Sequence, residues 1–126
     1  MRADTEQWWE QARADLVSAR GLLAIGQFYA VSLFAQQAAE KAIKALLIEQ
    51  RGGTLPRRSH DLEFLASEAG VLAPLQADLT TLAPVFEMAR YPDHSGLAPA
   101  NRIGHGDAQN HLDAAERIVA WIGGRL

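Results

Sequence analysis

The chain has 126 residues, a length that suits one domain with one hydrophobic core. Hydrophobic residues make up 48% and charged residues 21% of it, and the formal net charge of −3 gives no sign of a basic face for duplex DNA. Cysteine is absent, which excludes disulfides, thiolate nucleophiles and cysteine-ligated zinc. The first residues are too polar for a signal peptide and no apolar run is long enough to span a membrane, so we expect a cytoplasmic protein.

The first expected helix covers about residues 4–25. Asp4 and Gln7 have the spacing of a capping box, with Asp4 as the N-cap. Gly26 suits the left-handed conformation that often follows a helix. Apolar residues recur at spacings of three and four, which indicates one buried face: Trp9, Ala12, Leu16, Ala19 and Leu23.

A second helix is expected over about residues 28–50. It is the longest and most apolar segment, and small residues in the middle of its apolar face favour close approach by its neighbours. We therefore predict that it is the central packing element. On its polar side, Glu40 and Lys44 stand four residues apart, an arrangement worth only about 0.3–0.5 kcal/mol if the pair is exposed.

Residues 51–60 contain two glycines and a proline, which predicts a loop. Ser59 is expected to cap a short helix that Gly70 ends. A further helix then begins near Pro74 and carries an apolar stripe as far as Phe86. Pro84 lies inside this helix, where it removes one backbone hydrogen bond, and predicts a kink.

No helical period survives over residues 91–106, so a long loop is predicted there, and loops of this length are more often functional than accidental. Asp107 is expected to cap the last helix. No strand pattern, repeat or second domain is present. Residues 1–126 are thus predicted to form one all-α domain, an up-and-down antiparallel four-helix bundle with one additional short helix.

Two segments favour an anion site. His60 at the start of the short helix is compatible with a plain capping turn, but together with Arg57 and Arg58 it has the composition of a phosphate site. The second segment is residues 90–93. The helix before it is expected to end at Tyr91, because a residue that precedes proline avoids the helical region. Arg90 then falls in the last helical turn, where it either stabilises exposed carbonyls in a lock with Asp93 or acts as a phosphate clamp.

His105, Asp107 and His111 have a superficial likeness to metal ligands, with Asp107 and His111 one helical turn apart. The spacing fixes no third ligand, so we expect a helix cap and an exposed histidine, with no metal and no other cofactor.

Three motifs resemble the landmarks of HEPN-domain proteins in their order and spacing. They are AQQAAEKAIKALL (residues 35–47), SHDLEFL (59–65) and RYPD (90–93), and the resemblance extends from about Trp9 to Trp121. It implies a bundle of four or five helices that pairs as a homodimer, often encoded beside a small nucleotidyltransferase. It also implies a fold similar to the substrate-binding helical domain of aminoglycoside nucleotidyltransferases.

Other HEPN proteins are toxins that cut RNA without a metal, and these carry an arginine, four to six residues and then a histidine. Here three residues separate Arg90 from His94 and two separate Arg102 from His105, and no arginine and histidine in the chain have the required spacing. Since metal-free cleavage needs a well-placed acid and base, the resemblance favours a binding module without catalysis.

The function expected from the resemblance is a non-catalytic nucleotide- or phosphate-binding partner of a nucleotidyltransferase, in a pair like a toxin and its antitoxin. The expected ligand-binding residues are Arg57, Arg58, His60, Arg90 and Asp93. One alternative is a metal-independent ribonuclease toxin that acts on RNA through Arg90 with His94 or His105. Another is a dimeric scaffold without a small ligand.

Overall fold

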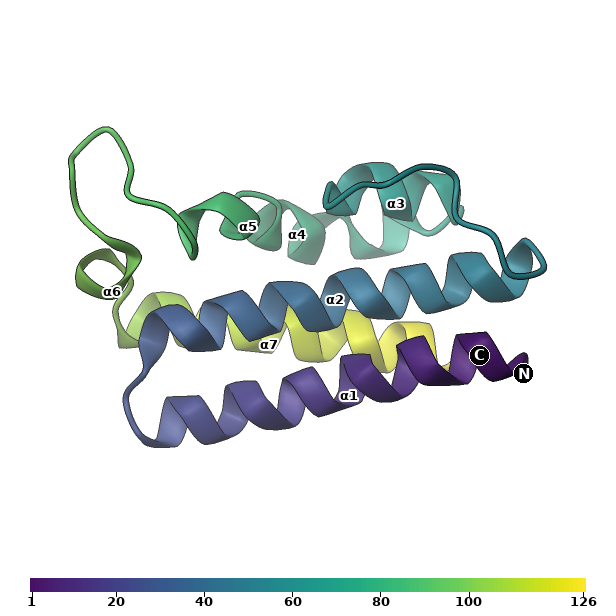
Figure 1. The fold of residues 1–126 in the computed structure, drawn as a ribbon, viewed down its shortest axis with the longest axis horizontal. Coiled ribbons are helices and arrows are strands. Elements are labelled where there is room, and N and C mark those ends of the chain that lie inside the picture. Colours follow the sequence, from purple (N-terminus) through teal and green to yellow (C-terminus); the bar gives the residue numbers. More distant parts are fainter.

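The computed structural model describes residues 1–126 as an all-α domain without strands (Figure 1), which confirms the predicted fold class. The three long helices α1, α2 and α7 lie side by side. The shorter helices α3, α4 and α5 lie on the side of α2 and α7 that faces away from α1. The two termini lie at the same end of the bundle. The helices are α1 (Ala3–Ala24), α2 (Phe28–Gln50), α3 (Leu62–Glu68), α4 (Leu72–Leu82), α5 (Val85–Met88), α6 (Pro99–Arg102) and α7 (His105–Gly123).

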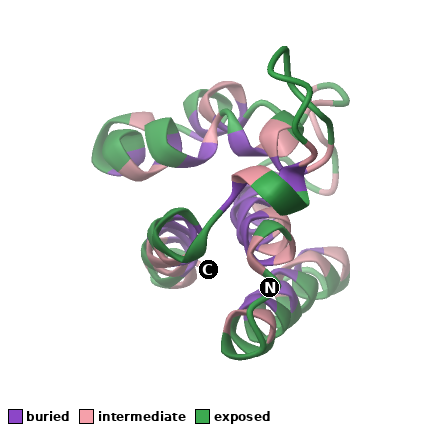
Figure 2. Cartoon of the chain, turned by 90° about the vertical axis from the view of Figure 1, so that its left-hand side faces the viewer, coloured by how far each residue is buried: buried purple, intermediate pink, exposed green.

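Helix α2 is the central element, as predicted: it contacts α1, α3, α5, α6 and α7. Four alanines of its middle turns are fully buried, and their small side chains let the neighbouring helices approach closely: Ala35, Ala38, Ala39 and Ala42. In the end view, buried segments of the helices face the interior of the bundle (Figure 2). None of the helices is long and apolar enough to cross a membrane.

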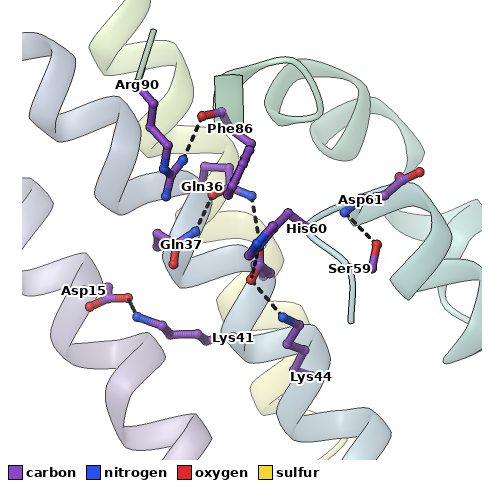
Figure 3. Close-up of polar contacts among 11 residues, drawn as sticks. Asp15, Gln36, Gln37, Lys41, Lys44, Ser59, His60, Asp61, Phe86 and Arg90 are labelled. Atoms are coloured by element: carbon purple, nitrogen blue, oxygen red, sulfur yellow. Dashed lines mark hydrogen bonds and ion pairs between the residues drawn. The ribbon is translucent and has the colours of Figure 1, made fainter. Parts of the chain in front are cut away.

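The polar side of α2 is buried at Glu40 and Lys44, so the small energy expected for an exposed pair does not apply to them. Glu40 is 3% and Lys44 8% exposed, and Gln36 on the same row is completely buried. Nearby, Lys41 Nζ lies 2.6 Å from Asp15 Oδ2, an ion pair that joins α1 to α2 (Figure 3). This side of α2 is therefore covered by α1 and by the segment that carries His60.

The fourth helix of the bundle is divided at Pro84, where a kink was predicted. Helix α4 ends at Leu82 and α5 begins at Val85, because proline has no N–H to continue the hydrogen-bond ladder. The predicted long loop contains the short helix α6, with Pro99 at its first position, where a missing N–H costs nothing.

Two predicted helix starts are wrong because the side chains have other partners. Helix α1 begins at Ala3, and Asp4 accepts a hydrogen bond from Arg2 Nε at 3.0 Å. The side chain of Asp61, not that of Ser59, caps α3 by accepting from the amide of Phe64 at 3.1 Å. Ser59 Oγ accepts from the Asp61 amide instead, at 3.0 Å.

The start of α7 also differs from the prediction. This helix begins at His105 with Gly104 as its N-cap, and Asp107 is the third helical residue, accepting from the Gly104 amide at 3.3 Å. The glycine ends are confirmed: Gly26 has a φ of 76° and Gly70 a φ of 73°.

A buried hydrogen bond links α2 to α7. His111, which was expected to be exposed, is only 7% exposed, and its Nδ1 lies 2.7 Å from Ser32 Oγ. Burial lowers the pKa of His111 from its ordinary value, and the carboxylate of Asp107 only partly opposes this shift. The imidazole is therefore neutral at neutral pH.

This burial makes stability depend on pH. The unfolded chain has the higher histidine pKa, near 6.5, so the unfolded state takes up the proton first as the pH falls. The contribution of His111 is complete above that value and is lost as the pH decreases toward the folded pKa. Denaturation between about pH 7.5 and about pH 5.5 should show a shallower fall in stability for His111→Gln than for the wild type. His94→Gln, at an exposed position, should keep the wild-type slope.

The close packing around α2 predicts the effect of enlarging a small residue. Ala38→Leu should lower the free energy of unfolding by about 1–3 kcal/mol, because the fully buried methyl group has no room for three more carbons. Ala77→Leu on the exposed side of α4 is the matched control and should change stability by less than about 0.5 kcal/mol. Equal losses in urea denaturation would contradict the packing described here.

Candidate anion-binding site

The carboxylate of Glu40 organises a polar cluster on α2. It receives hydrogen bonds from Lys44 Nζ at 2.9 Å and from Gln36 Nε2 at 3.2 Å. Its third neighbour is His60 Nδ1, at 3.0 Å from Oε1. Since His60 follows the 51–59 loop, this contact fixes the end of the loop against the middle of α2.

The ring of Phe86 joins His60 to Arg90. The His60 and Phe86 rings are stacked, with centroids 4.1 Å apart and planes 16° apart. The guanidinium carbon of Arg90 lies 3.9 Å from the centroid of the same phenyl ring, and Nη1 donates to the carbonyl of Phe86 at 2.7 Å. Two groups this close to one ring centre must occupy opposite faces, as Figure 3 shows. The structure thus brings together two motifs that are distant in the sequence.

A cleft of about 800 Å³ lies on one side of His60, and its charge is basic. Arg57, Arg58, Lys44 and Trp8 line it together with His60. Arg57 lies over the Phe64 ring at 4.0 Å, and neither arginine forms an ion pair. The positive charge of Lys44 is offset by Glu40, so the two guanidinium groups supply the net charge of this cleft.

The other side of His60 has the opposite charge. A second cleft, of about 850 Å³, is lined by Asp61, Glu63 and Glu87 as well as by His60 and Phe86. The exposed imidazole therefore borders a basic cleft and an acidic one. An anionic ligand is attracted only to the first of them.

The predicted pairing of Arg90 with Asp93 is wrong. Asp93 Oδ2 lies 3.2 Å from Arg102 Nη1, and Asp93 also accepts from the side chain and the amide of Ser95. These Ser95 hydrogen bonds are the main cause of the lowered pKa of Asp93. Arg102 closes the loop as well, since it donates to the carbonyls of Met88, Tyr91 and Leu97. The prediction that Arg90 binds a carbonyl of the last helical turn is confirmed.

His94 and His105 do not join the cluster within one chain. His94 is exposed in the loop, and His105 at the start of α7 packs edge-on against Phe28 with centroids 5.5 Å apart. No group of three or more histidine or carboxylate side chains is arranged to hold a metal ion.

Sequence reasoning missed Glu40, Phe86 and Trp8 as members of the site. Glu40 was assigned only to the polar side of the second helix, and Phe86 to an apolar stripe. One local signal was present: Gln36, Glu40 and Lys44 form a polar row at four-residue spacing along the most apolar helix. Such a row on a central helix indicates a buried network that needs further partners.

The fold and the cluster together define a helical-bundle protein whose central helix holds an imidazole between two clefts of opposite charge. The model of the HEPN domain matches residues 5–125, and the chain belongs to the HEPN family.

Two solved structures are similar to the chain over its whole length. TT1696 from Thermus thermophilus is 29% identical, with a TM-score of 0.86 over 99% of this chain and 100% of that one. ST0689, an archaeal HEPN homologue, is 30% identical, with a TM-score of 0.80 over 99% of this chain and 98% of that one. Among curated proteins, none matches the chain.

The burial of Glu40 predicts a large effect of its removal. Glu40→Ala should lower the free energy of unfolding by about 3 kcal/mol, since it leaves the Lys44 ammonium buried without a counter-ion. Asp78→Ala removes a carboxylate from the surface pair with Arg117 and should cost less than about 1 kcal/mol. Guanidinium denaturation of both variants measures the difference, and a small effect at Glu40 would show that this network is not structural.

Proposed function

We propose that the protein is a non-catalytic HEPN module that binds a nucleotide or another phosphorylated ligand and partners a small nucleotidyltransferase. The observation that carries this proposal is the pair of unpaired guanidinium groups, Arg57 and Arg58, beside the exposed imidazole of His60 in one cleft. Most other arginines of the chain form ion pairs with carboxylates.

The chemistry of the cleft suits a phosphate ester. Guanidinium groups bind phosphate oxygens through two parallel N–H donors, and an imidazole adds a further donor when both of its nitrogens carry a proton. Trp8 offers an aromatic face on which a base can stack. A volume of about 800 Å³ lies within the range of small-ligand pockets.

Arg90 and Asp93 have different parts in this proposal. Arg90 uses Nη1 for the Phe86 carbonyl, which leaves its other N–H groups for a ligand that reaches past His60. Asp93 bonds to Arg102 and Ser95, so we assign it to holding the 91–98 loop. The proposed ligand contacts are therefore Arg57, Arg58, His60 and Arg90.

The chain belongs to the HEPN family, and the resemblance to that family implies a homodimer and a nucleotidyltransferase partner. In this proposal the basic cleft takes the nucleotide or phosphorylated group on which the partner acts.

A metal-independent ribonuclease is the second candidate. It is favoured by the contact of the Glu40 carboxylate with His60 Nδ1, because a carboxylate that orients an imidazole leaves Nε2 free to act as a base. The sequence pattern suggested Arg90 with His94 or His105 for this chemistry. Neither histidine contacts Arg90 within one chain, so that pairing requires a second subunit to supply the histidine.

Titration calorimetry with ATP and with pyrophosphate tests the binding proposal. We expect saturable binding that weakens at least tenfold, about 1.4 kcal/mol, in the double variant Arg57→Ala/Arg58→Ala. Arg13→Ala, which removes an unpaired arginine from the distant α1 surface, should leave the affinity unchanged. Equal affinity in all three proteins, or no binding at all, would refute a phosphate site in this cleft.

Two further assays separate the candidate functions. Co-expression with a nucleotidyltransferase encoded beside this chain should give one complex in size-exclusion chromatography. Incubation of the purified protein with RNA should leave the RNA intact. RNA cleavage that is abolished in His60→Ala would support the ribonuclease instead. If ligand binding, partner binding and RNA cleavage are all absent, the dimeric scaffold is the function that remains.

A further inference from the structure

An apolar groove of about 530 Å³ lies between α7 and α1, an outer helix of the bundle that contacts α2 and α7 (Figure 1). Six of its eleven lining residues are hydrophobic. Only two are hydrophobic in each of the two clefts beside His60 and in a cleft of about 510 Å³ among α5, α6, α7 and the 91–98 loop. The side chain of Val17, on the α1 wall of the groove, is on a residue that is 64% exposed. Apolar surface gathered in this way is typical of an interaction site.

The charges along the groove fall into one satisfied pair and two single groups. Arg20 Nε lies 2.6 Å from Glu116 Oε1, an ion pair that bridges α1 and α7. Glu10 and Arg13 also line the groove, and both are exposed. Although they stand only three positions apart, they do not pair with each other or with any other charged group. One negative and one positive charge are thus left without a partner on the same side of α1.

These two charges make this side of α1 complementary to itself. In a two-fold symmetric contact, the same patch of both subunits meets, so each residue faces the other's counterpart in reverse order. Two antiparallel α1 helices whose symmetry axis passes between positions 10 and 13 place each Glu10 beside the other copy's Arg13. A partner of a single charge sign, such as a nucleic acid, would attract one of these residues and repel the other.

We propose that a second copy of this chain covers the groove, with α1 packed antiparallel on the partner's α1 and Glu10 paired with the partner's Arg13. The homodimer is part of the proposed function, on which this assignment therefore rests. The contact removes Val17 and the exposed part of Trp9 from water, and the two ion pairs fix the register of the helices.

The basic cleft stays open in this arrangement. Trp8, which lines that cleft, precedes Val17 on α1 by nine residues, or about two and a half helical turns. The two side chains therefore project from opposite sides of the helix. Each subunit of the dimer keeps its own basic cleft, accessible to a phosphorylated ligand.

Sedimentation equilibrium of the whole protein tests the assignment. We expect a wild-type dimer whose Kd rises at least about tenfold in Glu10→Arg and in Arg13→Glu, because each change sets like charges against each other on both sides of the axis. The double variant Glu10→Arg/Arg13→Glu restores opposite charges and should regain the wild-type Kd, a rescue that a folding defect would not show. Glu87→Arg, at an exposed carboxylate outside the groove, is the matched control and should dimerise as the wild type does.

Three results would overturn the assignment, and they differ in what they leave standing. A monomeric wild type would refute the homodimer itself. A dimer that persists in both single variants would put the contact on another face while the homodimer stands, and a double variant without rescue would exclude the pairing of Glu10 with Arg13. Because the basic cleft lies within one subunit, a failure of the ATP titration would leave these results unaffected.

Discussion

A carboxylate taken out of water must be surrounded by hydrogen-bond donors, and Glu40 meets this constraint at the centre of the bundle. Two of its partners, Gln36 and Lys44, come from its own helix. The third, His60, comes from a loop, so the requirement for a donor fixes that loop on α2. Phe86 then stacks on the same imidazole and carries Arg90 on its other face. Lys44 and His60 thus bind the buried acid directly, and Arg90 is connected to it through Phe86.

The same arrangement gives the surface opposite charges on the two sides of His60. His60 forms a partition: arginines of the 51–60 segment lie on one side of it, and the acidic residues of α3 and α5 lie on the other. Because the imidazole is held from the buried side, its free edge stays in the solvent between the clefts. One helical bundle thus carries two clefts of opposite charge that share a single imidazole as a wall.

The fold could be predicted because its determinants are local. Apolar residues at spacings of three and four identified the long helices, and Gly26, Gly70 and Pro84 marked their boundaries. Exact helix starts failed where two acceptors competed, as with Ser59 and Asp61, since the choice between them depends on a difference smaller than sequence patterns resolve.

The site could be predicted only in part. Arg57, Arg58 and His60 adjoin one another in the chain, so their proximity was predictable. The meeting of His60 with Arg90 depends on how α5 packs on α2, and no spacing within either motif specifies that. The partner of Asp93 was missed for the same reason: Arg102 reaches it only because α6 turns back toward the end of α5.

The division of the fourth helix at Pro84 has a mechanical consequence. Beyond this proline, α5 forms its own backbone hydrogen bonds, and the Arg102 guanidinium binds the carbonyls of Met88, Tyr91 and Leu97. Glu87, just past the break, belongs to the walls of two clefts at once. Any displacement of α5 at Pro84 would therefore alter the walls of both clefts together.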